Sequence, residues 1–225
     1  KKSSMMIKLE NLKICIIGLG YVGLPLAIEF AKKRNVIGFD INKKRIEQLN
    51  NNYDLNNEFN NQQIKDASKL KFVSQLKDYG CNCFIITAPT PIDKFKKPDL
   101  SFLSEASKNV GKTLKKNDIV IYESTVYPGC TEEICVPILE QESSLKLNKD
   151  FFCGYSPERI NPGDKVHSIE NTKKILAIQT GNQIIKKKII SIYKTITKKI
   201  ILSNKVEEAE MAKLIENIQR DLEIA

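Results

Sequence analysis

The feature that most constrains the fold is a glycine-rich turn, GLGYVG, which spans residues 18–23 directly after an apolar run at 13–18. Gly18 allows a tight turn, Gly20 lets the backbone approach a pyrophosphate, and Gly23 lets the following helix pack closely on the strand. The free N–H groups and the positive dipole end of that helix attract phosphate. The turn therefore predicts a strand–turn–helix unit that binds a dinucleotide.

An acidic residue follows the second apolar run of the chain. Asp40 comes directly after VIGF at 36–39, at the distance from the glycine turn where dinucleotide-binding domains place a carboxylate. A carboxylate at this position binds both ribose hydroxyls and repels a 2′-phosphate. Asp40 therefore indicates NAD rather than NADP as the cofactor.

Short apolar runs alternate with amphipathic stretches along almost the whole chain. Such β–α alternation, with strands short enough to be buried on both faces, favours a parallel sheet covered by helices on both sides. The expected strands cover residues 13–18, 36–39, 71–74, 83–88, 118–124, 151–156, 175–178 and 199–203. The expected helices lie near residues 22–33, 43–50, 101–115, 130–142 and 182–194. The predicted fold is α/β, a Rossmann-type doubly wound, mostly parallel sheet.

The chain ends in a strong helix pattern at 206–225 that has no Gly or Pro stop signal. A helix without a stop signal suggests that the chain is cut short inside it. We therefore expect an NAD-binding, Rossmann-like domain over 1–203 and the first part of a long central helix over 204–225. The Asn-rich stretch around 50–63 is expected to be a surface loop.

Composition restricts the class of protein. Of the 225 residues, 41% are hydrophobic and the net charge is +9, which favours a folded globular chain over a disordered one. No apolar run approaches the roughly 20 residues of a membrane span, and no apolar signal core follows the N-terminal KKSSMM. Six cysteines without paired metal spacing and a single histidine indicate no metal site. We expect a cytoplasmic protein with free thiols and no membrane or nucleic-acid partner.

Positive charge is concentrated at 186–199, where six lysines occur with no acid among them. A nucleic-acid surface is one interpretation, but no aromatic platform is interleaved with these lysines, and apolar residues recur at helical spacing. A solvated helix face is therefore favoured. A basic surface would also attract the phosphates of a nucleotide or nucleotide sugar.

Three polar loops follow apolar runs, at TAPTP (87–91), ESTVYPG (123–129) and SPERINPGD (156–164). Ligands of open α/β sheets bind at the carboxyl ends of strands, so we expect the first two loops to face the cofactor. In the last helix pattern, Lys213 and Asn217 share one face at i, i+4 spacing, where an ammonium and an amide together stabilise an oxyanion. Taken alone, TAPTP also fits a rigid turn, SPERINPGD a solvated loop, and Lys213 an ordinary surface helix.

Taken in order, the blocks GLGYVGLPLA, TAPTPID, ESTVYPG, SPERINPGD and AEMAKLIENIQRDLEIA resemble the UDP-glucose/GDP-mannose dehydrogenase family over nearly all of residues 7–225. The SPERINPGDK-x-H form, which ends at His167, is most similar to UDP-N-acetylhexosamine 6-dehydrogenases. The resemblance implies NAD-dependent, four-electron oxidation of the sugar C6 alcohol to a uronic acid, for surface polysaccharide biosynthesis. It also implies a homodimer of the full-length protein, paired through the central helix.

The resemblance assigns roles to individual residues. Glu158 would do acid/base work on the water that hydrolyses a thioester, with Thr125 nearby. Lys213 and Asn217 would bind substrate and stabilise developing negative charge, and Lys213 is also a candidate base for the C6 hydroxyl. These four are the expected catalytic residues. The expected cofactor-binding residues are Gly18, Gly20, Tyr21, Val22, Gly23, Asp40, Arg45, Thr90 and Thr125. The expected substrate-binding residues are Glu158, Arg159, Ile160, Asn161, Pro162, Lys213 and Asn217.

The family also needs a nucleophilic cysteine in a Gly-Gly-His-Cys-like block and a second α/β domain that binds UDP. Neither occurs in this sequence, so we expect the NAD-binding half of a longer enzyme, inactive alone. Cys130 stands at an expected helix start, where a thiol pKa is lowered, but it falls within the cofactor region rather than at C6. His167 is expected to form loop hydrogen bonds rather than to catalyse.

Two other functions stay open. A β-hydroxyacid dehydrogenase-like enzyme also follows its dinucleotide-binding domain with a helix that carries Lys-x-x-x-Asn, although the three polar loops speak against it. A non-catalytic basic domain would bind nucleic acid or another partner through its lysines, with a steep salt dependence. Among the sugars, UDP-GlcNAc and UDP-GalNAc differ in one epimeric hydroxyl, and the sequence does not separate them from each other or from UDP-glucose.

Overall fold

The apolar runs of the sequence become the strands of one sheet. The computed structural model describes residues 12–92, 94–95, 97–158, 169 and 172–224. Within these residues the sheet has eight strands in the order β3-β2-β1-β4-β5-β6-β7-β8. The strands are β1 (Ile14–Ile17), β2 (Val36–Phe39), β3 (Leu70–Val73), β4 (Cys83–Ile86), β5 (Ile119–Tyr122), β6 (Phe152–Tyr155), β7 (Lys174–Ile178) and β8 (Ile200–Ser203). All neighbours run parallel except β6 and β7, which are antiparallel, so the predicted mostly parallel sheet is confirmed.

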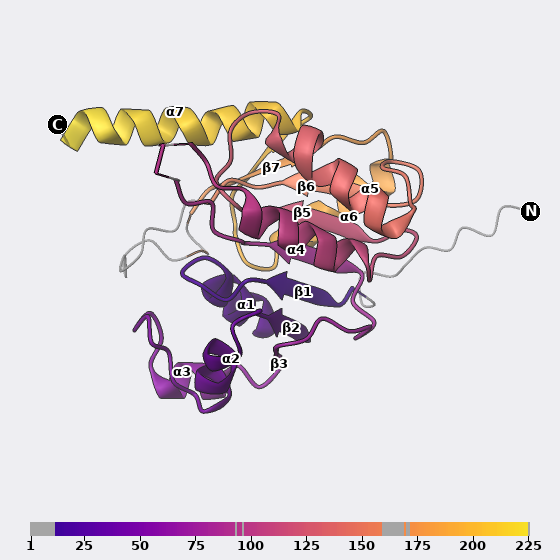
Figure 1. Ribbon diagram of the computed structural model, residues 1–225. Coiled ribbons are helices and arrows are strands. Elements are labelled where there is room, and N and C mark those ends of the chain that lie inside the picture. The colour runs from indigo at the N-terminus through magenta and orange to yellow at the C-terminus, as the bar shows by residue number, and fades with distance from the viewer. Residues whose placement is uncertain (1–11, 93, 96, 159–168, 170–171, 225) are drawn as a thin grey trace, which may run out of the picture.

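Helices cover both faces of this sheet (Figure 1). They are α1 (Gly23–Ala31), α2 (Lys43–Asn50), α3 (Asn61–Asp66), α4 (Ser101–Gly111), α5 (Val136–Ser143), α6 (Gln183–Tyr193) and α7 (Val206–Ile224). A π-helical turn, Thr131–Cys135, leads into α5. The helices α1, α2, α3 and α6 contribute apolar side chains to the core on one face, and α4, α5 and α7 contribute to the core on the other. This is the doubly wound arrangement that β–α alternation predicts.

The central strands are buried on both faces, and their side chains alternate between the two cores. In β1, Ile14 and Ile16 belong to the core that includes α1, whereas Cys15 and Ile17 belong to the core that includes α4. Because successive side chains point to opposite faces, a run of four apolar residues is satisfied only in a sheet covered on both sides. The edge strands β3 and β8 are partly exposed.

Asparagine side chains cap the starts of three of the described helices, α2, α3 and α6. Asn42 accepts hydrogen bonds from two backbone N–H groups at the start of α2, and Asn60 forms a capping box with Gln63 at the start of α3. The Asn-rich stretch around 50–63, expected to be a surface loop, therefore runs into a short helix. Asparagine favours both loops and helix starts, so composition alone does not separate the two.

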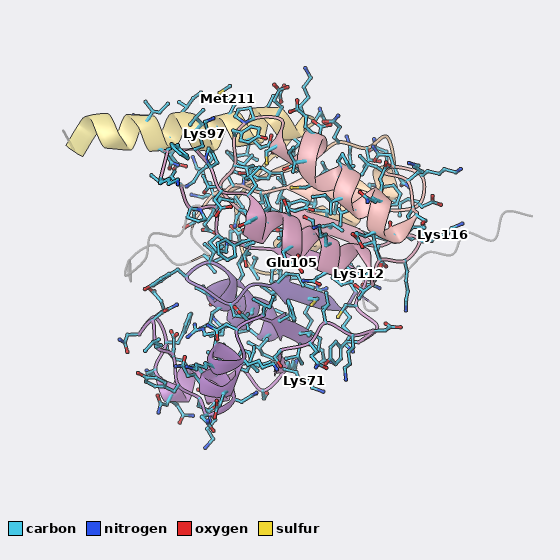
Figure 2. The ribbon with its side chains drawn as sticks, viewed as in Figure 1. Lys71, Lys97, Glu105, Lys112, Lys116 and Met211 are labelled. Carbon is cyan, nitrogen blue, oxygen red and sulfur yellow. The ribbon has the colours of Figure 1, made fainter. Side chains whose placement is uncertain are left out.

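The lysine-rich stretch 186–199 forms most of α6 and the turn after it. Lys187 and Lys194 are exposed, as expected for a solvated helix face. Elsewhere on the surface, Lys71 of β3 is also exposed (Figure 2). Lys188 differs from this prediction: it is buried, and burial lowers the pKa of its ammonium group. The face is therefore less uniformly solvated than its composition suggests.

The expected last helix is present as α7. It lies along one side of the domain, and its C-terminal part extends past the sheet (Figure 1). Its first turns are anchored, because Val206 and Ala209 are buried in the core that α4 and α5 cover. No helix in the described part of the chain is long and apolar enough to cross a membrane.

Candidate active site

A cleft of about 980 Å³ opens at the carboxyl ends of β1, β2, β4 and β5, between α4 and α7. This volume is at the upper end of the about 300–1,000 Å³ typical of ligand pockets, as a dinucleotide requires. The cleft brings together segments that are far apart in the sequence. The predicted site residues that line it are Gly18, Gly20, Tyr21, Val22, Asp40, Thr90, Thr125, Glu158, Lys213 and Asn217.

The glycine turn has the geometry that each glycine was expected to provide. Gly18 has a φ of +96°, which favours glycine, and its N–H donates to the carbonyl of Phe39 at 2.8 Å. A Cβ on Gly23 would lie 1.8 Å from the carbonyl oxygen of Gly18, so only glycine lets α1 start this close to the turn. A Cβ on Gly20 would meet nothing within 4 Å. Gly20 therefore leaves open space at the cleft for a phosphate to approach.

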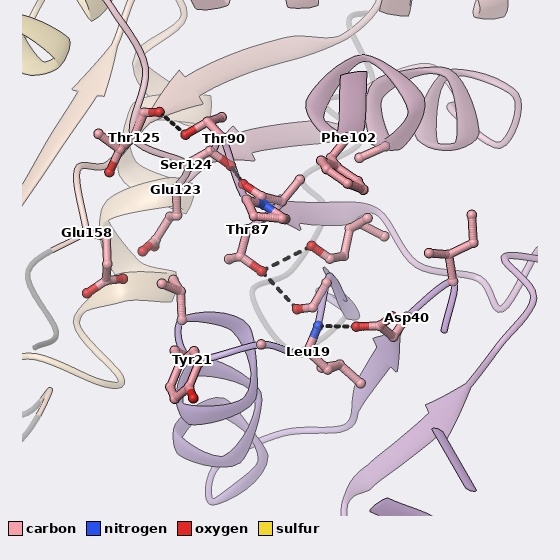
Figure 3. Close-up of a pocket in the computed structure, with 18 of the residues that line it drawn as sticks. Leu19, Tyr21, Asp40, Thr87, Thr90, Phe102, Glu123, Ser124, Thr125 and Glu158 are labelled. Atoms are coloured by element: carbon pink, nitrogen blue, oxygen red, sulfur yellow. Dashed lines mark hydrogen bonds between the residues drawn. The ribbon is translucent and has the colours of Figure 1, made fainter. Parts of the chain in front are cut away.

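Thr87 holds this turn against the end of β4. Its hydroxyl lies 3.1 Å from the carbonyl oxygen of Ile17 and 2.9 Å from that of Gly18, to which it donates (Figure 3). The two carbonyls belong to the end of β1 and the start of the turn. These hydrogen bonds hold the turn in shape, which lowers the entropy cost of binding a ligand.

Asp40 projects from the end of β2 beside the glycine turn (Figure 3). Its Oδ2 accepts the N–H of Leu19 at 2.8 Å, and its Oδ1 accepts the N–H of Asn42 at 2.8 Å. An ionised carboxylate has about four acceptor sites, so both oxygens keep capacity for ribose hydroxyls. A negative charge here, an open Gly20 and a free helix start fit NAD as the bound dinucleotide.

Arg45 lies behind the turn and is not among the residues that line the cleft. Its Nε donates to the carbonyl of Leu19 at 3.0 Å, and its Nη1 lies 2.7 Å from Oδ1 of the buried Asp54. Asp54 in turn accepts backbone N–H groups of the 51–60 segment. Asp54 could not be predicted from the sequence, because an acid inside an Asn-rich stretch carries no signal for a partner on α2.

The loops after β4 and β5 are joined to each other. The hydroxyl of Thr90 donates to the carbonyl of Thr125 at 2.5 Å, and that of Ser124 donates to the carbonyl of Ala88 at 2.6 Å (Figure 3). From β6, the buried hydroxyl of Tyr155 donates to the carbonyl of Ser124 at 3.0 Å. These bonds make one rigid wall from two loops that the sequence presents separately.

The four expected catalytic side chains all line this cleft: Glu158, Lys213, Asn217 and Thr125. Glu158 and Lys213 are buried, with 6% and 7% of their surface exposed. The ammonium of Lys213 lies 3.9 Å from Oε2 of Glu216, one turn further along α7. Four of the expected substrate-binding residues, Arg159, Ile160, Asn161 and Pro162, lie outside the described residues, as does His167.

A buried carboxylate fixes α7 at the cleft. One oxygen of Glu210 accepts the N–H of Gly129 at 2.6 Å, and the other accepts the N–H and the hydroxyl of Thr131 at 3.0 Å and 2.6 Å. These donors belong to the start of the π-helical turn, where unpaired N–H groups favour an anion. Because Lys213 follows Glu210 by one helical turn, this contact also positions the lysine at the cleft.

Two further residues near the cleft, Lys174 and Tyr193, carry no signal in the sequence. The ammonium of Lys174 contacts Oε2 of Glu123, and the hydroxyl of Tyr193 donates to Oε1 of Glu123 at 2.5 Å. Burial raises the pKa of Glu123 to about 7, partly offset by Lys174. Burial alone would lower the pKa of Lys174, but Glu123 and Glu158 outweigh it and raise that pKa above its usual value.

All six cysteines are free thiols, and five of them are buried. Cys130 does not line the cleft. A hydrogen bond with Cys135 lowers the pKa of Cys130 more than burial raises it, but the thiol has no exposed surface. Among the described residues, no group of three or more His, Cys, Asp or Glu side chains is arranged to hold a metal ion.

Comparison with known proteins identifies the family. Residues 12–197 match the NAD binding domain of the UDP-glucose/GDP-mannose dehydrogenase family. The chain is 53% identical to a UDP-N-acetyl-D-glucosamine 6-dehydrogenase of Pseudomonas aeruginosa, over 96% of this chain and 51% of that protein. It is also 53% identical to the enzyme of the same name from Salmonella typhi, over 98% of this chain and 52% of that protein.

A solved structure gives the same result. The UDP-D-ManNAc dehydrogenase of Pyrococcus horikoshii superposes with a TM-score of 0.85 at 33% identity, over 93% of this chain and 51% of that one. The chain thus spans about half the length of the relatives it matches. The resemblance read from the GLGYVG, TPTP and SPERINPGD blocks is confirmed, and the chain belongs to the UDP-glucose/GDP-mannose dehydrogenase family, whose NAD binding domain it carries.

Proposed function

We propose that an enzyme containing this chain oxidises the C6 alcohol of a UDP-N-acetylhexosamine to a uronic acid, with NAD as the hydride acceptor. One observation carries the proposal. The glycine turn and Asp40 line one end of the cleft, and Glu158, Lys213, Asn217 and Thr125 line the same cleft beyond them. A dinucleotide bound with its adenosine ribose at Asp40 extends toward these four residues.

The choice of sugar rests on relatives. Two proteins 53% identical to this chain are named UDP-N-acetyl-D-glucosamine 6-dehydrogenases, and several named UDP-N-acetyl-D-mannosamine dehydrogenases are 31–34% identical. We therefore place UDP-GlcNAc first, and UDP-GalNAc, which differs from it in one epimeric hydroxyl, stays the alternative. A protein named CapL, 50% identical, supports a role in surface polysaccharide biosynthesis.

The residues of this chain would act on the sugar through charge and hydrogen bonding. Lys213 and Asn217 lie on one face of α7, where an ammonium and an amide stabilise the negative charge that develops on the reacting oxygen. Glu158 is a buried carboxylate suited to move a proton to or from a water. The carbonyl of Thr125 is held by Thr90, which keeps this wall of the cleft in place. NAD, when bound, supplies the hydride acceptor.

The remaining parts of the proposal concern the whole protein. We assign 1–203 to the NAD-binding domain and 204–225 to a helix that pairs two protomers. Apolar side chains exposed on α7 support this pairing, and they are Met211, Leu214, Ile215 and Ile218. Figure 2 shows Met211 on the outer side of the helix. A UDP site and a nucleophilic cysteine would come from a second domain. Six free thiols fit a reducing cytoplasm.

Two measurements test the proposal. Thermal shift of this chain with NAD and NADP should show stabilisation by NAD, about 2.7 kcal/mol when the ligand is at 100 times its Kd, and little effect of NADP. The enzyme containing this chain should form two NADH per UDP-GlcNAc or UDP-GalNAc consumed. One NADH per sugar, or activity on 3-hydroxy acids instead, would contradict the proposal.

A further inference from the structure

A buried ion pair lies behind the glycine turn, outside the residues that line the cleft. Nη1 of Arg45, on α2, is 2.7 Å from Oδ1 of Asp54, and the two side chains are 10% and 0% exposed. The carboxylate of Asp54 is itself fixed, because its oxygens also accept backbone N–H groups within residues 56–59. A buried ion pair adds little net stability compared with an apolar pair of similar volume. What this pair holds in place is therefore the better guide to its role.

The ion pair reaches the turn through a hydrogen bond, in which Nε of Arg45 donates to the carbonyl oxygen of Leu19 at 3.0 Å. Other contacts hold the rest of this residue. The N–H of Leu19 donates to Oδ2 of Asp40 at 2.8 Å (Figure 3). Its side chain packs against β2, since a Cβ on Gly38 would lie 3.1 Å from it. These contacts fix the N–H and the side chain, whereas the carbonyl is held by Arg45.

The direction of this carbonyl also decides the direction of the next N–H. The carbonyl of Leu19 and the N–H of Gly20 belong to one planar trans peptide, so they point in opposite directions. With the carbonyl directed at Arg45, the N–H of Gly20 is directed away from it. Leu19 and Gly20 both line the cleft, whereas Arg45 does not. The N–H of Gly20 is therefore oriented to donate to a phosphate in the cleft.

Without Arg45, the same peptide is free to take the opposite orientation. A peptide flip changes mainly ψ of Leu19 and φ of Gly20, and glycine takes a positive φ about as readily as a negative one. Gly20 is not at positive φ in the structure, so the unflipped orientation is the one present. After a flip, the carbonyl oxygen of Leu19 would face the phosphates and repel them.

We propose that Arg45, held by Asp54, keeps the Leu19–Gly20 peptide in the orientation that presents the N–H of Gly20 to the pyrophosphate of NAD. Arg45 and Asp54 are then positioning residues, which act on the cofactor through the turn without touching it. The inference rests on the proposed function, because it requires the pyrophosphate of NAD to bind at the glycine turn.

The sign of the effect of Asp54→Asn separates this role from long-range attraction of the phosphates by Arg45. If the guanidinium acted by its charge alone, removal of the neighbouring negative charge would tighten NAD binding. We expect the opposite, a weakening of about tenfold, because Arg45 is held less firmly; this is the order for one hydrogen bond to a charged group. Arg45→Lys keeps the charge but loses the Nε–H, and should weaken NAD binding by a similar factor.

Adenosine is the second probe, because a general disruption of the cleft would weaken it together with NAD. It carries the ribose but no phosphate, and the N–H of Leu19 still holds Asp40 in both variants. The Kd of adenosine should therefore stay within about twofold of the wild type. Both constants are measured on the 225-residue chain by competition with NADH, whose fluorescence reports binding. Glu47→Gln, which neutralises an exposed acid on α2, is the matched control and should leave both constants within about twofold.

One measurement needs no variant and decides the matter where a variant fails to fold. In ¹H–¹⁵N spectra of the wild-type chain, the Gly20 amide should move downfield with ADP and stay in place with adenosine. An amide that ADP leaves in place overturns the inference. So do variants that bind NAD as tightly as the wild type or more tightly, and variants that weaken NAD and adenosine by the same factor. A wild-type chain that binds neither NAD nor ADP refutes the proposed cofactor site itself, and the inference falls with it.

Discussion

Gly23 is the position where one added methyl group should disrupt both the fold of the glycine turn and its binding of NAD. In Gly23→Ala, the new Cβ would lie 1.8 Å from the carbonyl oxygen of Gly18 and 2.5 Å from the hydroxyl oxygen of Thr87. The first contact is with backbone, which cannot rotate away as a side chain can. The start of α1 must therefore move by more than 1 Å from the end of β1.

The size of the effect follows from this contact. Overpacking of a well-packed core costs about 1–3 kcal/mol, and a clash with backbone belongs at the upper end of that range. A loss of about 3 kcal/mol in the free energy of unfolding lowers Tm by about 6–12 °C in a chain of this length. The displaced helix start also moves the N–H groups that bind phosphate, so NAD affinity should fall as well.

Gly20→Ala is the matched control. Its Cβ would meet nothing within 4 Å, and its backbone lies outside the region that favours glycine, so the free energy of unfolding should stay constant or rise by about 0.4–1 kcal/mol. Its methyl group would nevertheless occupy the space left for the pyrophosphate. Urea unfolding and NAD titration of both variants check this contrast. A stable Gly23→Ala, or a Gly20→Ala that binds NAD like the wild type, would refute the reasoning.

Three further predictions concern single side chains. Asp40→Asn should weaken NAD binding about tenfold and reduce the preference for NAD over NADP, because the charge that repels a 2′-phosphate is lost. The ratio of the Kd values for NADP and NAD measures this preference. Glu210→Ala should lower the free energy of unfolding by about 3 kcal/mol, since buried donors lose an ionised acceptor, whereas the exposed Glu207→Ala should change it by less than about 0.5 kcal/mol. Burial raises the pKa of Asp118 to about 6, so its contribution to stability is present at low pH and is lost as the pH rises through 6. Asp118→Asn should flatten this part of the curve of unfolding free energy against pH, and an unchanged slope would contradict the assignment.

The sequence was most informative where local chemistry and global fold agree. Every expected strand is present, because four-residue runs such as ICII at 14–17 can be buried only in a sheet covered on both faces. The glycine turn could be predicted because each of its glycines meets a different requirement of the backbone. The position of the cleft could be predicted from the topology, since parallel strands bring their carboxyl ends to one edge of the sheet.

Long-range pairs of buried charges could not be read in this way. Arg45 was expected to contact the cofactor, but the structure pairs it with Asp54 and the carbonyl of Leu19, behind the turn. Asp54 and Glu210 are acids in stretches rich in polar residues, where an acid is ordinarily solvated. Only the packed structure shows that each accepts several backbone N–H groups.

Lys174 shows why direction within the sheet decides which residues reach the site. In a wholly parallel sheet, the first residue of a strand lies at the edge opposite the cleft, and a lysine there is expected to be solvated. However, β7 runs antiparallel to β6, with Tyr155 opposite Ala177 and Gly154 opposite Ile178. This reversal brings the start of β7 to the carboxyl ends of β5 and β6, where Lys174 meets the carboxylates of Glu123 and Glu158. Because β8 runs parallel to β7, it has the same reversed direction. It is followed by α7, which places Lys213 at the cleft.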